Sequence, residues 1–395
     1  MTHSNTRHLL LLLFLTLGMG TVIAQQTPTI VAGPMIGEVN MREAKLWVML
    51  DVSGEVQYRY TDSETGSVVS SAIVKTQSEV QGHHYATVTL NTLLPGRQYD
   101  LDLYLNGTKA DIEPIHIKTP PDWVFRAEPP EFRIALGSCA FTNDKPFDRP
   151  GGAYGGGYAI YGSIVDKQPD MMLWLGDNVY LRTSDINSRT GIFYRYGQTR
   201  SLPEMQKLLR SCPNYAIWDD HDFGPNNSDR SYLHKDHALD AFKAYWPNPS
   251  VGTPEIKGAV SMFNYGDVDV YLLDNRYHRS PNNRKTGSRG ILGEAQLQWL
   301  IDAMKSSYAK FKLVCIGGQV LNTVAKYETH QRVAPGERRA LLKLIQEVNI
   351  NGVVFLTGDR HHSELSMLAE DGQPTIYDFT VSPLTSGAHD AKAEA

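Results

Sequence analysis

Hydrophobic and polar residues alternate in short runs between residues 28 and 118. Runs such as "EVQYRYT" (55–61) and "QYDLDLYL" (98–105) place apolar side chains at every second position, and turn-forming residues such as "LPGR" (94–97) separate the runs. A period of two is typical of strands that bury one face. We therefore expect a small all-β domain over residues 28–118.

A proline-rich stretch over residues 119–131 separates this region from a different pattern. Apolar runs now lie far apart with helix-like stretches between them, which is typical of α/β domains whose strands are covered on both faces. The expected strands are "FRIAL" (132–136), "MMLWL" (171–175), "NYAIW" (214–218), "VDVYLLD" (268–274), "KLVCIG" (312–317), "GVVFLT" (352–357) and "IYDFTV" (376–381). The expected helices lie in "YAIYGSIVDKQ" (158–168), "LPEMQKLLRSC" (202–212), "EAQLQWLIDAMKSS" (294–307) and "GERRALLKLIQEV" (336–348). We therefore expect an α/β domain over residues 131–395, preceded by a sandwich of the immunoglobulin or fibronectin type III kind over 28–118.

The first 24 residues differ from both regions. Arg7 precedes an apolar run from Leu9 to Leu17, and small residues end the segment near Ala24. This order is typical of a secretory signal peptide, and the run is too short to cross a bilayer comfortably. We expect residues 1–24 to be removed after export to the periplasm, the cell surface or the medium. A retained membrane anchor is the alternative.

Composition narrows the possible functions. Hydrophobic residues make up 41% of the 395 residues and charged residues 21%, which is typical of a globular protein, and the net charge is −5. An acidic balance argues against a broad nucleic-acid groove, which needs a basic surface. No second apolar stretch is long enough to span a membrane. The cysteine count of three leaves at least one thiol unpaired, and Cys139 is a candidate ligand.

Charged or metal-binding side chains follow five of the expected strands at the point where each strand ends. The groups are "GSC" (137–139), "GDNVY" (176–180), "DDHD" (219–222), "DNR" (274–276) and "GDRHH" (358–362). Sites in open α/β sheets form outside the carboxyl ends of the strands, so we expect these side chains to meet at one edge. Carboxylates so close together would repel one another unless a cation neutralises them. The pattern therefore predicts a metal site.

The mixture of side chains bears on the kind of metal. Carboxylate and amide oxygens favour calcium, magnesium or manganese, whereas the Cys139 thiolate and the Tyr180 phenolate favour a transition metal such as iron. Each cluster alone is also compatible with an acidic surface loop, a turn or a structural histidine. A secreted binding protein stabilised by structural calcium is another alternative. Ligands that are far apart in sequence, and that include Cys and His, argue against it.

Taken together, several motifs resemble the PhoD-like alkaline phosphatase and phosphodiesterase family, a branch of the calcineurin-like metallophosphoesterases. The motifs are "GSC", "GDNVY", "WDDHD", "LDNRYHR", "GVVFLTGDRHHSE" and "SPLTSG". The resemblance runs from about residue 30 to the end of the chain. It implies a four-layer α/β sandwich after an immunoglobulin-like domain, metal-dependent hydrolysis of phosphate esters, and iron and calcium as the metals.

The resemblance also implies roles for individual residues. Cys139 and Tyr180 would ligate iron, and Asp177 would bridge the metals. Asp220 stands where the wider superfamily has a metal-binding asparagine. His221 matches the histidine that assists the leaving group.

Further residues follow from the same comparison of motifs. Asp359 and His361 match two metal ligands, with the aspartate in place of a histidine. Arg276 is a candidate phosphate contact, and a structural salt bridge is its alternative. Asp219 and Asn226 would be additional contributors to the site.

The expected function is that of an exported phosphoric ester hydrolase. A hydroxide activated by two metal ions would attack phosphorus in a small phosphate-ester substrate. His221, Asp177 and Arg276 would take part in catalysis. A phosphodiesterase or phospholipase D-type activity on the same fold is the main alternative. Ser138 is a rival nucleophile, although the sequence assigns no base to it.

Overall fold

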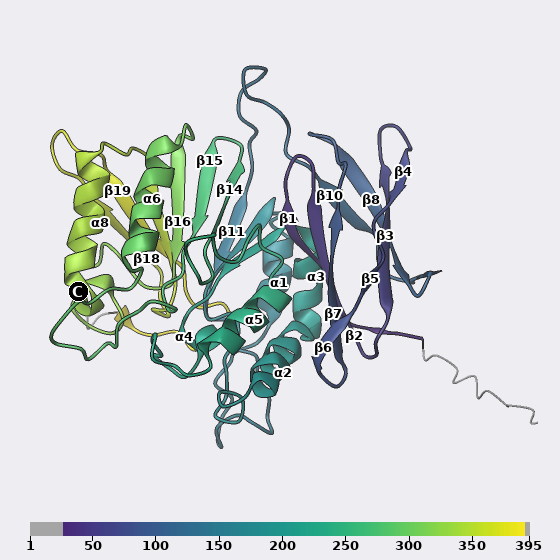
Figure 1. Ribbon diagram of the computed structural model, residues 1–395, viewed down its shortest axis with the longest axis horizontal. Coiled ribbons are helices and arrows are strands. Elements are labelled where there is room, and N and C mark those ends of the chain that lie inside the picture. Colours follow the sequence, from purple (N-terminus) through teal and green to yellow (C-terminus); the bar gives the residue numbers. More distant parts are fainter. Residues whose placement is uncertain (1–26, 392–395) are drawn as a thin grey trace, which may run out of the picture.

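The computed structural model describes residues 27–391. The signal peptide expected over residues 1–24 lies outside the described residues. Figure 1 shows a β-rich part, formed by the N-terminal region, packed beside a larger part in which helices cover two further sheets. No helix within the described range is long and apolar enough to cross a membrane.

The N-terminal part consists of two sheets around one apolar core. One sheet has the strand order β1-β2-β7-β6, and the other has the order β10-β8-β3-β4, with β5 paired to β3 and β9 paired to β8. The strands are β1 (Ile30–Val39), β2 (Ala44–Leu50), β3 (Glu55–Asp62), β4 (Val68–Ser70), β5 (Val74–Lys75), β6 (Gln77–Val80), β7 (His83–Leu90), β8 (Gln98–Leu105), β9 (Thr108–Lys109) and β10 (Ile115–Lys118). Alternate residues of β8 are buried, as a period of two predicts. An all-β N-terminal part is therefore what this region forms.

This sandwich is tied to the rest of the chain by direct hydrogen bonds. The indole N–H of Trp47 donates to the carbonyl of Ala244 at 2.9 Å, and the side-chain amide of Asn214 donates to the carbonyl of Ile36 at 3.1 Å. Trp47 also belongs to an apolar core that continues into the following α/β part. The sandwich therefore supports the larger part over a continuous packed interface.

Two sheets form the centre of the larger part. The first has the order β11-β12-β13 and the second has the order β14-β15-β16-β17-β19-β18. Their strands are β11 (Ile134–Gly137), β12 (Met171–Leu175), β13 (Asn214–Ile217), β14 (Ser261–Tyr265), β15 (Val268–Leu272), β16 (Phe311–Ile316), β17 (Val353–Thr357), β18 (Glu364–Leu368) and β19 (Ile376–Thr380). All neighbouring pairs are parallel except those of the edge strands β14 and β18. The carboxyl ends of the parallel strands in each sheet therefore lie at one edge.

The larger part contains longer helices, most of which cover the outer faces of the sheets (Figure 1), and one-turn helices within loops. They are α1 (Ala159–Val165), α2 (Arg189–Arg200), α3 (Pro203–Ser211), α4 (Asp220–Phe223), α5 (Lys235–Tyr245), α6 (Glu294–Ser306), α7 (His330–Val333) and α8 (Pro335–Glu347). In Figure 1, α6 and α8 lie over the six-stranded sheet, and α1, α3 and α5 lie between the three-stranded sheet and the sandwich. In α6 the buried residues Leu297, Leu300, Ile301 and Met304 recur at the helical period and face the core.

The two sheets also contact each other through an apolar layer. Leu173 and Leu175 of β12, Ile217 of β13, and Val270 and Leu272 of β15 belong to this one buried cluster. Every residue of β12 is buried, which agrees with its continuous apolar sequence. The α/β class expected from the sequence is confirmed, because helices and mainly parallel sheets build this part.

Candidate metal centre

The loops that follow β11, β12, β13 and β17 bring most of the predicted site residues to one place. Cys139, Asp177, Asp359 and His361 all adopt left-handed backbone conformations, with φ between 51° and 66°. A non-glycine residue in this region costs roughly 1–3 kcal/mol, and such residues cluster at functional sites. The chain therefore turns sharply after β11, β12 and β17, and the four loops bring polar side chains together.

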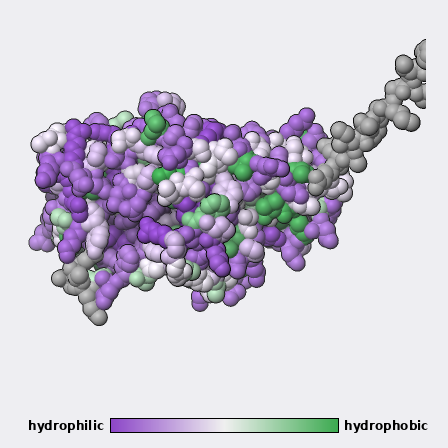
Figure 2. Space-filling view, turned by 90° about the horizontal axis from the view of Figure 1, so that it is seen from below, coloured by the Kyte–Doolittle hydropathy of each residue, from purple (hydrophilic) through white to green (hydrophobic). Residues whose placement is uncertain are grey.

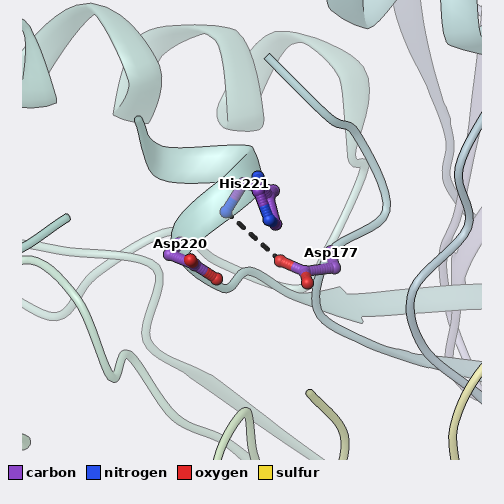
Figure 3. Close-up of side chains that lie close together, drawn as sticks. All are labelled: Asp177, Asp220 and His221. Atoms are coloured by element: carbon purple, nitrogen blue, oxygen red, sulfur yellow. Dashed lines mark hydrogen bonds between the residues drawn. The ribbon is translucent and has the colours of Figure 1, made fainter. Parts of the chain in front are cut away.

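Asp177, Asp220 and His221 form a first group of metal-binding atoms. One oxygen from each aspartate and one ring nitrogen of His221 all lie within 4.8 Å of one another. Figure 3 shows the three side chains converging from the loop after β12 and from the short helix α4. The backbone N–H of His221 donates to Oδ1 of Asp177 at 3.2 Å, which fixes the loop against the helix.

Asp219, Asp220 and Asp359 form a second group, with one oxygen from each within 4.8 Å of the others. Asp220 belongs to both groups. Oδ2 of Asp219 is buried and accepts no hydrogen bond within the described chain, and Oδ1 of Asp220 has only the Arg276 guanidinium beside it, at 3.5 Å. Buried polar atoms are almost always paired, so these two oxygens are suited to bind a cation.

The pKa values of these carboxylates also indicate a cation site. Burial raises the pKa of Asp177 well above its usual value, and the neighbouring charges of Asp220 and Asp219 raise it further. Burial and the charges of Asp219 and Glu328 raise the pKa of Asp359 in the same way. A cation would reverse this balance by attracting every carboxylate at once. The two groups therefore fit bound metal ions.

Cys139 and Tyr180 lie beside the same carboxylate. The Cys139 Sγ atom is 3.7 Å from Oδ2 of Asp177, and the Tyr180 hydroxyl is 3.3 Å from that oxygen. Both side chains are buried, and burial raises the pKa of each. Cys139, Asp177 and Tyr180 therefore offer sulfur, carboxylate and phenol atoms at one point.

His361 lines the same cavity as Asp177 and Asp220 but belongs to neither group of closely spaced ligand atoms. Its Nδ1 atom donates to the carbonyl of Gly387 at 2.6 Å, because a carbonyl can only accept. This bond orients the ring and leaves Nε2 as the nitrogen that can bind a metal.

Arg276, the candidate phosphate contact, is held in buried ion pairs. Its side chain is 1% exposed, and it is absent from the residues that line the cavity. The guanidinium instead pairs with Asp219 and Glu328, each at 2.5 Å, and it lies 3.5 Å from Asp220. These contacts agree with the alternative role of Arg276, that of a structural salt bridge. Glu328, which the sequence analysis did not identify, also pairs with Arg279 at 2.7 Å.

Asp222 connects two of the site loops. Its carboxylate accepts hydrogen bonds from the backbone N–H groups of Asn178 and Val179, both at 3.0 Å, and of Asp219 at 2.9 Å. The last bond is part of a capping box at the start of α4. Asp222 thus holds the loop after β12 against the loop after β13. Its position inside the "DDHD" motif was the only sequence signal for this role.

The Ser138 hydroxyl is not available as a nucleophile. The side chain is fully buried, and its Oγ donates to the carbonyl of Val381 at 2.9 Å. Ser138 is not among the residues that line the cavity at the metal centre.

A cavity of about 620 Å³ opens onto the two groups of ligands. It is lined by Tyr154, Asp177, Asp220, His221, Asn226, Asn227, Asp229, Pro281, Asn282, Asn283, Tyr327, Glu328, Arg332, Asp359, Arg360, His361, His389 and Asp390. The expected contributor Asn226 is exposed at this cavity, and the backbone N–H of its neighbour Asn227 donates to Oδ2 of Asp220 at 2.6 Å. A volume of this size suits a small-molecule ligand.

Comparison with known proteins gives this site a context. Residues 135–395 match the family model of the PhoD-like phosphatases, and residues 27–121 match a domain of unknown function, DUF7800. Alkaline phosphatase D of Bacillus subtilis (strain 168) is 24% identical over 295 residues, which cover 61% of this chain and 50% of that protein. The chain thus spans about half the length of this curated relative.

Two solved structures share the fold. The structure of PhoD superposes with a TM-score of 0.73 at 20% identity, covering 89% of this chain and 77% of the other. The purple acid phosphatase PPD1 from yellow lupin (Lupinus luteus) seeds gives a TM-score of 0.66 at 12% identity, covering 90% and 65%. These likenesses show that the chain shares the α/β fold of the two phosphatases. With the family model matching two thirds of its residues, the chain belongs to the PhoD-like phosphatase family.

Proposed function

We propose that this protein hydrolyses phosphate esters at a centre that holds at least two metal ions. The observation that carries the proposal is the sharing of Asp220 between two groups of ligand atoms. A shared carboxylate would allow two cations to bind side by side, as two-metal hydrolases require. The family to which the chain belongs and its relative alkaline phosphatase D both support a phosphoric ester as the substrate.

The residues favour different metals at the two positions. Cys139 and Tyr180 lie beside Oδ2 of Asp177 and offer soft or phenolic ligands, which favour iron. Asp219 and Asp359 offer only oxygen and favour calcium. Metal ions held there supply Lewis acidity toward the phosphate ester.

The protein's own residues have separate tasks in this proposal. The ring of His221 lies at the cavity and stacks on Tyr180 at a centroid distance of 4.3 Å. In this proposal Cys139, Asp177, Tyr180 and Asp220 would hold the first ion, so that the His221 ring stays free to give a proton to the leaving oxygen. Arg276 acts as a positioning residue, because it orients Asp219 and does not line the cavity. Asp177 accepts a hydrogen bond from the backbone N–H of His221 and would hold a metal ion together with Asp220. The resemblance of its motif implies that Asp177 would also be shared with the second ion.

Several finer expectations belong to the same proposal. We propose a four-layer α/β sandwich over residues 131–395 and an immunoglobulin-like domain over 28–118, with the boundary in the proline-rich stretch 119–131. The apolar layers on both faces of each central sheet support the first part. We also propose export to the periplasm, the cell surface or the medium, on the basis of the sequence of residues 1–24.

A pair of aspartate variants tests the proposed function. Asp177→Asn should lose bound metal and reduce phosphate release from an aryl phosphate by about 100-fold or more, because a bridging ligand is lost. Asp229→Asn is the matched control, since Asp229 lines the same cavity but belongs to neither group. Wild-type metal content and turnover in Asp177→Asn would show that Asp177 has no bridging role.

A further inference from the structure

A second cavity of about 320 Å³ adjoins the metal centre. It shares three lining residues with the first cavity, namely Tyr154, His221 and Asn226. The two cavities therefore meet at His221, the side chain that the proposed function places beside the leaving oxygen. A group attached to that oxygen would extend into the second cavity.

Aromatic side chains form the walls of this second cavity. The ring centroid of Phe141 lies 4.8 Å from that of Tyr154 and 4.9 Å from that of Tyr180. Phe147 and Tyr154 are 45% and 50% exposed, although both are large and apolar. Exposed aromatic side chains around a cavity are a common feature of ligand sites, where ring faces pack against planar groups.

The loop that carries two of these rings is held in place. Asn143 accepts a hydrogen bond from the backbone N–H of Gly155 at 3.0 Å and donates to its carbonyl at 3.1 Å. Asp144 pairs with the buried guanidinium of Arg195 at 2.8 Å, and Asp148 pairs with Arg182 at 2.7 Å. The cavity is therefore formed before a ligand enters, which lowers the entropic cost of binding.

The charges around the cavity favour one class of ligand. Asp148 is neutralised by Arg182, whose guanidinium also lies 4.1 Å from the centroid of Phe141. The exposed guanidinium of Arg149 also lines the cavity. The guanidinium groups of Arg182 and Arg149 disfavour a positively charged ligand, and the Asp148 carboxylate is already paired. Aromatic walls without these charges would suit such a ligand. A planar ring without positive charge fits these surroundings.

We propose that the second cavity is a subsite for an aromatic group on the alcohol part of the phosphate ester. This inference rests on the proposed function and specifies its substrate class. The ester's phosphate would lie at the metal centre, with His221 beside the leaving oxygen. The attached ring would pack among Phe141, Phe147 and Tyr154.

The experiment compares two esters of primary alcohols, benzyl phosphate and cyclohexylmethyl phosphate, which differ mainly in the planarity of the ring. Wild-type protein should prefer the benzyl ester, measured as the ratio of kcat/KM values. Phe147→Leu should lower this ratio by about 3- to 10-fold, because an aromatic contact is lost while an apolar side chain remains. Phe125→Leu is the matched control, since Phe125 is fully exposed and lines neither cavity.

A second measurement does not depend on turnover. Inhibition by benzylphosphonate and by cyclohexylmethylphosphonate should show the same preference, and Phe147→Leu should reduce it. Turnover of both esters with no preference, or an unchanged ratio in Phe147→Leu, would overturn the subsite while leaving the proposed function intact. The absence of phosphate release from either ester and from an aryl phosphate would overturn both.

Discussion

The backbone N–H of His221 and the carboxylate of Asp177 are joined by a hydrogen bond of 3.2 Å. The bond links helix α4 to the loop after β12, as Figure 3 shows. It occupies Oδ1 of Asp177, whereas Oδ2 faces the hydroxyl of Tyr180 and the thiol of Cys139. The orientation of this carboxylate is therefore set by the protein itself, which is the preorganisation that a metal ligand requires.

The role of His221 is tested with leaving groups of different basicity. His221→Ala should slow alkyl phosphates by about 10²- to 10⁴-fold, because their alkoxides need a proton, and it should slow aryl phosphates much less. Kinetic constants for both ester classes, together with the metal content of the variant, provide the measurement. An equal loss for both classes with reduced metal content would instead make His221 a ligand of the first group.

Asp222 should act on stability and metal binding together. Asp222→Asn replaces an acceptor of three backbone N–H bonds with an amide and should lower the free energy of unfolding by about 1–3 kcal/mol. Metal content should fall as well, since both site loops lose their common anchor. Urea unfolding and elemental analysis measure these effects, with the exposed Asp302→Asn on α6 as control. Unchanged metal binding would leave Asp222 a purely structural residue.

Arg276 should prove structural in its effects. Arg276→Met leaves Asp219 and Glu328 as uncompensated buried carboxylates and should cost about 3–5 kcal/mol of stability. The exposed Arg332, which lines the cavity, provides the comparison, because Arg332→Met should change stability by only about 0.5 kcal/mol or less. Stability is read from urea unfolding and phosphate binding from product inhibition. If Arg276→Met had normal stability but weaker inhibition by phosphate, Arg276 would be a phosphate contact after all.

A pH-dependent part of the stability is expected away from the metal centre. Burial alone would raise the pKa of Glu337, but bonds from His330 and from the backbone N–H groups of Leu292 and Ile291 lower it below its usual value. A lowered folded-state pKa stabilises the protein above the ordinary glutamate value of 4.5 and loses this contribution as the pH falls through the folded-state value.

Glu337→Gln should therefore destabilise the protein at neutral pH and have a smaller effect in acid. The free energy of unfolding, measured by urea titration from pH 7 to pH 3, gives the difference between wild type and variant. A difference that is constant with pH would show that the charge of Glu337 makes no contribution. Lys343→Gln, at an exposed position of α8, serves as the control.

The sequence pattern predicted the buried parallel strands and missed the edges. The run "MMLWL" matches β12 residue for residue, because a strand covered on both faces must be apolar throughout. The edge strand β18 was missed, since its residues are half-buried or exposed and its sequence "ELSML" is short. Helix α2 was also missed, because it buries Arg195 and Arg200 and contains two glycines in addition to apolar residues.

The site was predictable to the extent that it follows strand ends. Asp177, Asp220 and Asp359 each stand two positions after an apolar run. Parallel pairing of β12 and β13 explains why Asp177 and Asp220 meet at one edge, whereas the approach of Asp359, after β17, depends on how the two sheets pack together. Glu328 gave no such signal, because it lies in a loop after β16, from which it lines the cavity and pairs with Arg276 and Arg279. Whether a charged side chain faces a substrate or a buried partner depends on tertiary packing that a strand pattern does not encode.

The central claim is that two cations share the carboxylates around Asp220. Elemental analysis of the purified protein, with phosphate release measured before and after chelation, tests it most directly. We predict more than one bound metal ion per chain, loss of turnover on chelation, and recovery when the metals are returned. Full turnover by protein that contains no metal would contradict the account.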